Sequence, residues 1–352
     1  MKQEILSKIA RLEIPLFLLK QYIPNANFLI ENGDDKKIIK GFSIDSRAVQ
    51  KDFVFLALEG ENFDGHSFLS EVKKNHAIGA IVKKQSIEKE FSELVDKNFF
   101  LISVDNVLEA FGKIAKTIRD SWRGKLITVT GSNGKTTAKE IISNILKEEV
   151  GDESKFASYG NQNNHIGVPL NLMRLNKKNK FAVIEMGMNR LGEIKHLSFM
   201  AKPNFSLIVN AQREHQEFLG SVRATAEENG TVIEHMIENK IVIFPKDKEN
   251  EDVWWNLVDK NQSKVVRFSL KNDESKFSIN KNSQEVICQI LDSNPLVAEF
   301  HLNGKLIGHA RLNGLGEHFA RTSTAAVAAS IALGVSHRSI FKGLETFKPI
   351  KG

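Results

Sequence analysis

The chain of 352 residues contains one cysteine, Cys288, in a stretch with the composition of a β-strand. A single thiol excludes a disulfide within the chain and any zinc site built from several cysteines. A free cysteine most often serves as a small buried apolar residue. We therefore expect Cys288 in the core, and a reducing cytoplasm as the location of the protein.

Long apolar segments are also missing. The longest run of small apolar residues, 325–335, is too short to span a bilayer and includes Ser330. Residues 1–8 carry charges where a signal peptide needs an apolar segment. The sequence therefore predicts no membrane insertion.

The net charge of +6 is not gathered into a dense Lys/Arg tract with interleaved aromatic residues. Such a tract is typical of nucleic-acid binders, whereas a moderate basic excess suits an enzyme of anionic substrates. We therefore expect no nucleic-acid partner. The hydrophobic fraction of 41% is ordinary for a globular protein, and the length suggests about two domains.

Alternating helix and strand patterns predict an α/β fold with domains at residues 1–105 and 106–352. Near the N-terminus, apolar residues recur at helical spacing, namely Ile5, Leu6, Ile9 and Leu12. Strand-length apolar runs lie at 53–58, 80–82, 99–102, 126–129, 181–184, 205–209 and 241–244. Helices are expected at 107–121, 137–149, 224–238 and 320–333. This alternation predicts a mostly parallel, doubly wound sheet in the second domain.

The pattern changes between residues 277 and 312. Short alternating strands surround an Asn303-Gly304 pair, which favours a tight hairpin turn. The sequence thus predicts a small antiparallel region beside the parallel sheet.

The strongest functional signal is a glycine-rich segment between the apolar run 126–129 and a helical pattern. Backbone N–H groups of such a loop bind phosphate, Lys135 adds a cation, and the Thr136 hydroxyl suits Mg²⁺. The loop is shorter than the commonest phosphate-binding loop, because Val129 stands where that pattern has its first glycine. Predicted phosphate-binding residues are Gly131, Ser132, Asn133, Gly134, Lys135, Thr136 and Thr137.

Three further groups follow this loop along the chain. Asn161, Asn163 and Asn164 carry amides that are costly to bury without partners, which favours a polar-ligand loop. Glu185 ends an apolar strand, a usual place for a second Mg²⁺ contact, although a helix-capping or exposed glutamate is the alternative. His215 follows the strand ending at Asn210 and suits a metal or a phosphate, with a structural histidine equally probable.

A weaker signal precedes the loop. Asp45-Ser46-Arg47 precedes a second polar group, Asp64-Gly65-His66. Ser and Arg near a turn bind phosphate, with the planar fork of Arg as donor, but a surface ion pair is the default alternative.

In this order, the motifs resemble those of the Mur ligase family over essentially the whole chain. Ser46, Arg47, Asp64 and His66 are similar to residues of the family's N-terminal uridine-nucleotide domain. The matches to its central ATPase domain are the segments 131–137, 160–169, 185–187 and 214–217. Gly316-Glu317-His318 resembles the segment that closes that domain.

The resemblance implies an ATP-dependent ligase of peptidoglycan synthesis with ATP and Mg²⁺ as cofactors. Its substrates would be UDP-N-acetylmuramoyl-tripeptide and D-alanyl-D-alanine, joined through an acyl phosphate. By the same resemblance, Lys135 neutralises phosphate charge, Thr136 and Glu185 hold one Mg²⁺, and His215 holds a second. His318 would contact the nucleotide. The implied substrate-binding residues are Ser46, Arg47, Asp64, His66, Asn161, Asn163 and Asn164.

Some positions depart from the family's pattern. Asn229 stands where many members have a lysine modified to a carbamate, so no carbamate is expected. Phe319 and Thr322 replace two asparagines of the closing segment. Residues 349–352 resemble the linker to the family's third domain, so the chain is interpreted as an excised fragment, a truncated reading frame or one half of a split enzyme whose third domain is a separate polypeptide. A non-catalytic remnant that binds nucleotide or precursor, and a related ligase of the folylpolyglutamate type, remain the alternatives.

Overall fold

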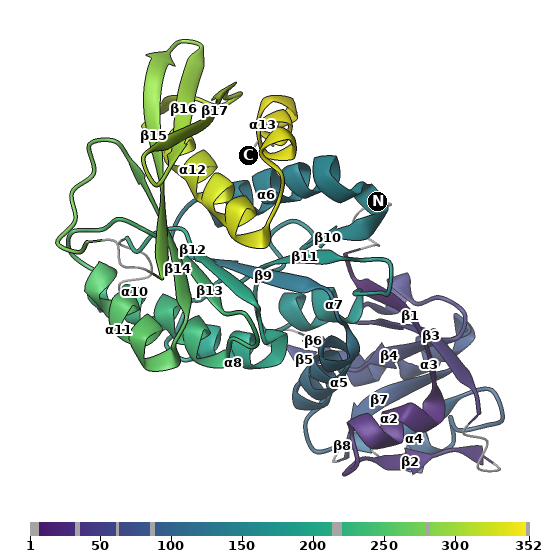
Figure 1. Ribbon diagram of the computed structural model, residues 1–352. Coiled ribbons are helices and arrows are strands. Elements are labelled where there is room, and N and C mark those ends of the chain that lie inside the picture. Colours follow the sequence, from purple (N-terminus) through teal and green to yellow (C-terminus); the bar gives the residue numbers. More distant parts are fainter. Residues whose placement is uncertain are drawn as a thin grey trace. The chain divides into compact units, whose positions relative to one another are not determined.

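The computed structural model describes residues 7–31, 36–60, 63–84, 89–212, 220–278 and 282–349. The chain forms two compact units, residues 1–122 with 169–176, and residues 123–168 with 177–352 (Figure 1). The division differs from the expected boundary at 105, because helix α5 (Val107–Ser121) packs within the first unit. The apolar face of α5 buries Phe111, Ile114 and Ala115 there.

The first unit contains a mixed sheet with the strand order β1-β3-β4-β7-β8-β2 among its described residues. The inner strands β3, β4, β7 and β8 are parallel, and β1 and β2 pair antiparallel at the two edges. The strands are β1 (Ile9–Pro15), β2 (Asn27–Leu29), β3 (Ile38–Ser43), β4 (Phe53–Leu56), β5 (Glu59–Gly60), β6 (Phe63–Asp64), β7 (Gly79–Lys83) and β8 (Phe100–Val104). The other elements are α2 (Leu16–Tyr22), η2 (Ser46–Ala48), η3 (Gly65–Phe68), α3 (Leu69–Lys74) and α4 (Lys89–Ser92).

Strand β1 corrects the N-terminal helix that the apolar spacing predicted. Ile9 and Leu12 lie on this strand, whereas Ile5 and Leu6 lie outside the described residues. The register with β3 shifts between Arg11 and Ile14, so that Ile9 and Ile14 are both buried. The irregular pairing breaks the strict alternation of a strand and leaves a spacing that imitates a helix.

The second unit contains a larger sheet with the order β10-β11-β9-β12-β13-β14-β15-β16-β17 among its described residues. The strands from β10 to β15 are parallel, as expected. They are β9 (Lys125–Thr130), β10 (Lys155–Ala157), β11 (Phe181–Glu185), β12 (Phe205–Ile208), β13 (Ile241–Pro245), β14 (Lys264–Leu270) and β15 (Ser283–Ser293). Strands β16 (Leu296–Leu302) and β17 (Lys305–Arg311) add the predicted antiparallel hairpins. Asn303 and Gly304 both have positive φ, at 50° and 79°, as the tight hairpin turn between β16 and β17 requires.

Helices cover both faces of this sheet (Figure 1). Helices α6 (Lys135–Val150), α12 (Gly316–Leu333) and α13 (His337–Thr346) lie on one face. Helices α8 (Glu193–Ala201), α10 (Val222–Gly230) and α11 (Glu251–Asn261) lie on the other. The remaining elements of this unit are η5 (Asp152–Ser154) and η6 (Thr231–His235), whereas α7 (Gly167–Met173) belongs to the first unit from Pro169 onward. The helix expected at 224–238 therefore ends at Gly230 and continues as a 3₁₀ turn.

The main core of the second unit lies between the sheet and helices α6 and α12. Ile127, Leu207 and Ile243 of the strands belong to one buried cluster with Ile141 of α6 and Ala326 of α12. Cys288 on β15 is fully buried in the same cluster, as its sequence context predicted. Burial raises the pKa of its thiol to about 11, so that the thiol stays protonated.

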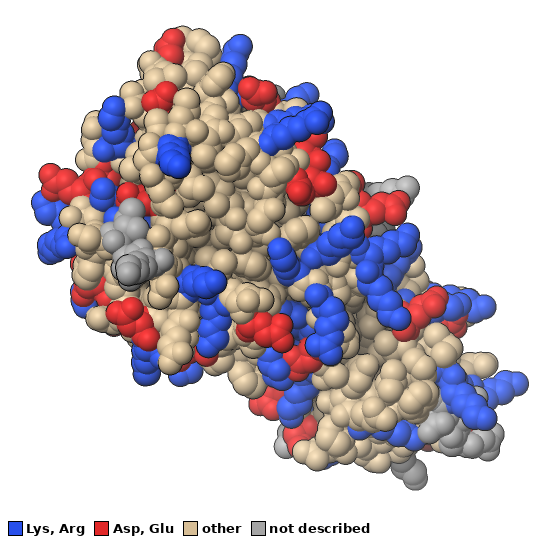
Figure 2. Space-filling model, viewed as in Figure 1, with Lys and Arg blue, Asp and Glu red and all other residues tan. Residues whose placement is uncertain are grey.

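Two properties of the surface bear on the sequence-based expectations. None of the described helices has the length and apolar character needed to cross a membrane. Lys and Arg side chains are interspersed with Asp and Glu on the face shown in Figure 2.

A buried ion cluster joins β14, β15 and α11. The guanidinium of Arg267 lies 2.9 Å from Glu285 and 3.4 Å from Glu251, and all three side chains are almost completely buried. Ser275 and the carbonyl of Phe277 accept further hydrogen bonds from Arg267. The cluster satisfies the charges that these elements would otherwise bury alone.

We predict that Arg267→Met destabilises the second unit by about 3–5 kcal/mol, because two buried carboxylates lose their cation. Urea denaturation followed by circular dichroism measures this loss. Arg223→Met is the matched control, because Arg223 forms an exposed ion pair with Asp252 at 2.8 Å. The prediction is wrong if both variants shift the urea midpoint equally.

Candidate functional site

The glycine-rich loop connects β9 to α6 at the place where the strand order of the second unit reverses. After β9 the chain forms β10 and β11 on one side of this strand, and it then crosses to form β12 on the other side. Open α/β sheets bind ligands at such a reversal, beyond the carboxyl ends of the strands. Gly134 is left-handed with a φ of +79°, and a Cβ there would lie 3.0 Å from the Thr322 hydroxyl oxygen. The turn into α6 therefore requires glycine at this position.

Asn210, immediately beyond β12, fixes the shape of this loop. Its side-chain oxygen accepts hydrogen bonds from the backbone N–H groups of Ser132, at 3.1 Å, and Asn133, at 3.0 Å. Its amide nitrogen donates to the Asn133 carbonyl at 3.0 Å. The Ser132 hydroxyl exchanges two further hydrogen bonds with the backbone of Gln212. Two of the loop's amides are thus used internally, whereas the start of α6 has no side-chain cap.

Lys135 is the first residue of α6, and its ammonium group turns back over the loop. It donates hydrogen bonds to the carbonyl oxygens of Gly131 and Ser132. The cation therefore lies beside the uncapped N-terminus of the helix, where the helix dipole also favours an anion. Loop, helix end and ammonium together form an arrangement that suits a phosphate group.

Glu185 and Thr136 are brought together as the strand pattern predicted. Glu185 ends β11 and pairs in register with Val129 of β9. Its Oε1 atom accepts hydrogen bonds from the Thr136 hydroxyl at 3.1 Å and from the Asn163 amide at 2.9 Å. Glu185 is only 1% exposed, and its Oε2 atom is buried with no hydrogen-bond partner.

This unpartnered oxygen indicates what the site holds. A buried carboxylate oxygen without a donor is costly, so its place in a native fold calls for an explanation. The donor set, a carboxylate beside a hydroxyl oxygen and next to a phosphate-type loop, is the one that hard divalent cations such as Mg²⁺ prefer. Thr136 and Glu185 therefore fit such a cation.

The three predicted asparagines of the asparagine-rich loop make different contacts. Asn163 points its amide at Glu185, and its backbone carbonyl accepts from Gly187 at 2.9 Å. The Asn164 side chain accepts from the backbone N–H groups of Ile166 and Gly167, and so caps the start of α7. The Asn161 carbonyl accepts from the Asn163 N–H at 2.8 Å. Of the three predicted asparagines, Asn163 thus contacts the core of the site.

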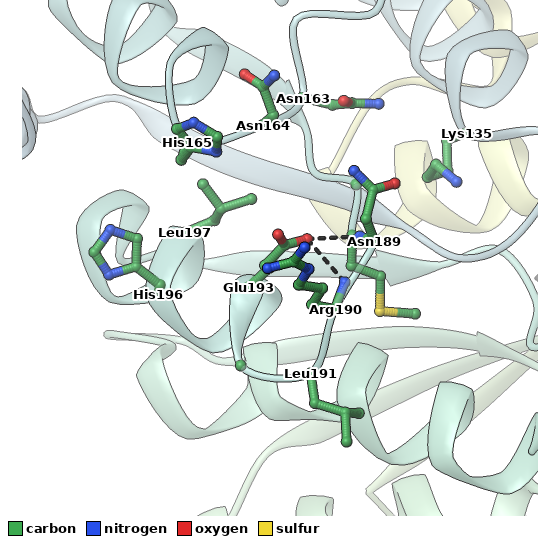
Figure 3. A pocket seen from close by; sticks show the side chains of 13 residues that line it. Lys135, Asn163, Asn164, His165, Asn189, Arg190, Leu191, Glu193, His196 and Leu197 are labelled. Atoms are coloured by element: carbon green, nitrogen blue, oxygen red, sulfur yellow. Dashed lines mark hydrogen bonds between the residues drawn. The ribbon is translucent and has the colours of Figure 1, made fainter. Parts of the chain in front are cut away.

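A cavity of about 490 Å³ lies beside Lys135 in the second unit (Figure 3). Lys135 lies on one side of it, and His165 and His196 lie on the opposite side. Glu193, at the start of α8, accepts hydrogen bonds from the backbone N–H groups of Asn189 and Arg190 and so shapes the cavity wall. The polar groups around the cavity suit a polar or anionic molecule next to the phosphate-type loop.

Helix α12 faces the same loop. Thr322 lies against Gly134, and its hydroxyl donates to the carbonyl of His318 one turn earlier. His318 is exposed in the first turn of α12. Phe319 stacks on Phe347 with ring centroids 6.2 Å apart, which gives this residue a packing role. The structure thus places His318 on the helix that borders the loop.

The predicted residues of the first unit form two local clusters. The Arg47 guanidinium forms a bidentate pair with Asp45, and this hydrogen bonding lowers the pKa of that carboxyl. Arg47 nevertheless leaves 83% of its side chain exposed, whereas Ser46 is buried. The surface ion pair, which was the alternative to phosphate binding, is therefore present between Arg47 and Asp45. The Arg47 side chain also faces solvent.

His66 is almost completely buried, with both ring nitrogens in hydrogen bonds. Its Nε2 atom accepts from the backbone N–H of Lys83 at 3.0 Å, so that Nδ1 carries the proton and faces Asp64 at 2.6 Å. Burial opposes ionisation of Asp64, but the hydrogen bonds from His66 outweigh it and lower the pKa of this carboxyl. His66 thus holds Asp64 and β7 in place, and a direct substrate contact by its ring stays a prediction.

The predicted metal ligand His215 lies outside the described residues, as do its neighbours from 213 to 219. Its role stays a prediction. Two residues of the site escaped the sequence-based search, Asn210 and Lys139. Asn210 had a signal, a polar residue directly after a buried strand. Lys139 also had one, because it interrupts the apolar face of α6 between Ala138 and Ile142.

Comparison with known proteins identifies the family of this chain. The family model of the Mur ligase middle domain matches residues 129–330, which include the loop, Glu185 and the start of α12. The chain belongs to the Mur ligase family. A second model, the catalytic domain of the Mur ligase family, matches residues 38–119.

Among curated relatives, the UDP-N-acetylmuramoyl-tripeptide–D-alanyl-D-alanine ligase of Haemophilus influenzae is 29% identical over 321 residues. The match covers 91% of this chain and 65% of the relative, so the chain spans just under two thirds of that protein's length. The structure is similar to that of MurF from Acinetobacter baumannii, with a TM-score of 0.80, 28% identity, and coverage of 97% of this chain and 70% of the other. MurF from Thermotoga maritima in complex with ADP gives a TM-score of 0.71 and 26% identity, over 88% of this chain and 66% of the other.

From the sequence, Asn229 is expected to stand at the position of the modified lysine of many Mur ligases. Here its side-chain oxygen accepts a hydrogen bond from the Thr130 hydroxyl at 2.6 Å, and its amide donates to the Thr225 carbonyl at 3.0 Å. The residue is fully buried. Asn229 therefore links α10 to the last residue of β9, directly before the phosphate-type loop.

We predict that Asn210→Leu increases the hydrogen-exchange rates of the Ser132 and Asn133 amides by about 10-fold or more. Each lost hydrogen bond contributes about 0.5–1.5 kcal/mol. Exchange measured by NMR on the folded variant checks this. Asn144→Leu on α6 is the control, because Asn144 bonds the Gly343 carbonyl and lies outside the loop. Unchanged exchange at Ser132 and Asn133 would contradict the role given to Asn210.

Proposed function

We propose that this Mur ligase chain binds Mg-ATP and takes part in joining D-alanyl-D-alanine to UDP-N-acetylmuramoyl-tripeptide. The single observation that carries the proposal is the buried Oε2 atom of Glu185, which has no hydrogen-bond donor and lies beside Thr136 and the phosphate-type loop. The names of the curated relatives support the choice of substrates. The solved relative in complex with ADP supports the choice of nucleotide.

The proposed reaction needs positioning and charge neutralisation. An oxygen of the tripeptide's terminal carboxylate attacks the γ-phosphorus of ATP, the bond to the β-phosphate oxygen breaks, and ADP leaves. The amine of D-alanyl-D-alanine then attacks the acyl carbon, loses a proton, and displaces phosphate. Both steps bring anions together, so that fixed cations and N–H donors contribute more than covalent help from the protein.

The residues of the second unit fit these requirements. Lys135 and the start of α6 would neutralise phosphate charge, with His318 near the nucleotide. Thr136 and Glu185 would hold Mg²⁺, which when bound lowers the repulsion between the reacting anions. Asn163 orients Glu185 through its hydrogen bond. The cavity beside Lys135 would receive the end of the peptide that carries the reacting carboxylate.

The first unit would bind the uridine-nucleotide part of the substrate. Arg47 offers an exposed guanidinium, and Ser46 lies in the same 3₁₀ turn, which Asp45 caps. Asp64 stays ionised through its hydrogen bonds with His66. Asn161, Asn164 and the second metal ligand His215 remain part of the proposal, as does a cytoplasmic location.

We predict that Glu185→Gln raises the Mg²⁺ concentration needed for half-maximal ADP binding by about 10-fold or more, because the carboxylate loses its charge. Binding in EDTA should change little. Lys135→Ala should instead weaken binding with and without Mg²⁺, because the ammonium contacts phosphate. Fluorescence titration with a labelled ADP measures both effects.

Glu299→Gln on β16 is the matched control for Glu185→Gln, because Glu299 pairs with His301 outside the site. The wild-type chain must bind ADP for the proposal to stand. Failure of the wild type to bind would reject it outright. Equal Mg²⁺ requirements for wild type and Glu185→Gln would reject the assignment of the metal site alone.

We predict that Arg47→Ala abolishes the rise in melting temperature that UDP gives the wild-type chain. An exposed guanidinium is a strong partner for a diphosphate, and alanine removes all of its donors. Differential scanning fluorimetry with and without UDP measures the shift. Arg11→Ala is the control, because Arg11 bonds the Gln50 side chain on the same unit. Retention of the full shift in Arg47→Ala would contradict the proposed uridine site.

A further inference from the structure

Lys139 is a lysine with no exposed surface, on the inner face of α6. Lysine is almost never fully buried unless its charge is paired. Apart from Ser143, the other buried positions on α6 are apolar, including Ala138 and Ile142. A residue of this kind costs stability compared with an apolar one, so its contacts indicate what it does.

The ammonium group of Lys139 has three hydrogen-bond donors, and three acceptors surround it. The carbonyl oxygens of Ser158 and Gly160 lie at 3.0 and 2.7 Å, and a carboxylate oxygen of Glu140 lies at 2.8 Å. The Oε2 atom of Glu185 lies farther away, at 3.7 Å. Lys139 therefore supplies positive charge beside Glu185 without using the open oxygen of that carboxylate.

The Ser158–Gly160 segment that Lys139 holds is itself part of the support for Glu185. The Ser158 hydroxyl accepts a hydrogen bond from the backbone N–H of Glu185 at 3.1 Å, and the Ser158 N–H donates to Val183 of β11 at 2.9 Å. The same loop continues to Asn163, whose amide reaches the other oxygen of Glu185. Lys139 thus connects α6, this loop and the carboxylate.

We propose that Lys139 is a positioning residue that sets the orientation of Glu185 and the loop 158–163, and thereby the affinity of the site for a divalent cation. This inference rests on the proposed function, because it takes Glu185 as a metal ligand. Residues that orient metal ligands typically affect metal affinity by about 10- to 100-fold.

Two effects of Lys139 on a cation have opposite signs, which makes the proposal testable. The positive charge of Lys139 repels a metal ion bound at Glu185. If electrostatics alone decided the outcome, removing this charge would tighten metal binding. Its hydrogen bonds hold the loop and the carboxylate in place, so that their loss would weaken binding. We infer that positioning dominates, because the three short contacts go to the loop and to Glu140 while Glu185 lies at 3.7 Å.

The test uses Lys139→Met, which keeps the length of the side chain but removes its charge and donors. Lys139→Arg retains both, and Lys147→Met removes an exposed lysine from the same helix as a matched control. Labelled ADP is titrated at a series of Mg²⁺ concentrations and in EDTA. Hydrogen exchange of peptides covering residues 156–165 is measured without metal or nucleotide.

We expect Lys139→Met to need about 10-fold more Mg²⁺ for half-maximal ADP binding, with little change in EDTA. Exchange in residues 156–165 should become faster. Lys139→Arg should recover part of both properties, and Lys147→Met should resemble the wild type. An unchanged or lower Mg²⁺ requirement in folded Lys139→Met would overturn the proposal.

Two further outcomes are kept separate. If Lys139→Met does not fold, Lys139→Gln, which retains two donors, takes its place, and the same Mg²⁺ and exchange criteria apply. If the wild type does not bind ADP, the proposed function fails. The hydrogen-exchange data then still decide whether Lys139 orders the loop. Unchanged exchange in residues 156–165 of the variant would overturn the positioning role of Lys139 as well.

Discussion

The structure of the second unit depends on one constraint, a carboxylate buried at the end of a central parallel strand. Glu185 is 1% exposed between β9 and the asparagine-rich loop, where an unpaired negative charge would be expensive. Thr136 and Lys139 from α6, together with Asn163 from the asparagine-rich loop, compensate it. The loop after β9, the first turns of α6 and the loop after β10 therefore have to be correctly placed together.

The topology of the sheet brings these segments to one edge. Parallel strands place all of their carboxyl ends on the same side, and the order of the strands reverses at β9. Residues distant in sequence, such as Thr130 and Asn229, or Ser132 and Asn210, then bond one another. Side-chain amides carry much of this long-range bonding, because they donate and accept at once.

Short-range features of this site could be predicted from the sequence, and long-range ones could not. The glycine-rich loop, Lys135 and Thr136 lie within a few residues, so that their spacing alone indicates their chemistry. Glu185 could be found because it ends an apolar strand. Asn210 bonds partners 77 and 78 positions earlier, and Lys139 contacts Ser158 and Gly160, which lie 19 and 21 positions later. No local pattern identifies these partners. The strand β1 escaped prediction for a related reason, since its irregular pairing with β3 decides which side chains are buried.

Neutralising a charge and satisfying its hydrogen bonds are different requirements, and the site separates them. Lys139 places an ammonium group near Glu185 but donates hydrogen bonds to the carbonyls of Ser158 and Gly160 and forms its closest ion pair with Glu140. The Oε1 atom of Glu185 takes two neutral donors, and Oε2 takes none. If Lys139 had formed a close hydrogen-bonded pair with Oε2, the carboxylate would be more fully satisfied and less able to bind a metal ion. The arrangement places a cation beside a buried carboxylate while leaving one of its oxygens without a hydrogen bond, which is the condition that a metal ligand has to meet.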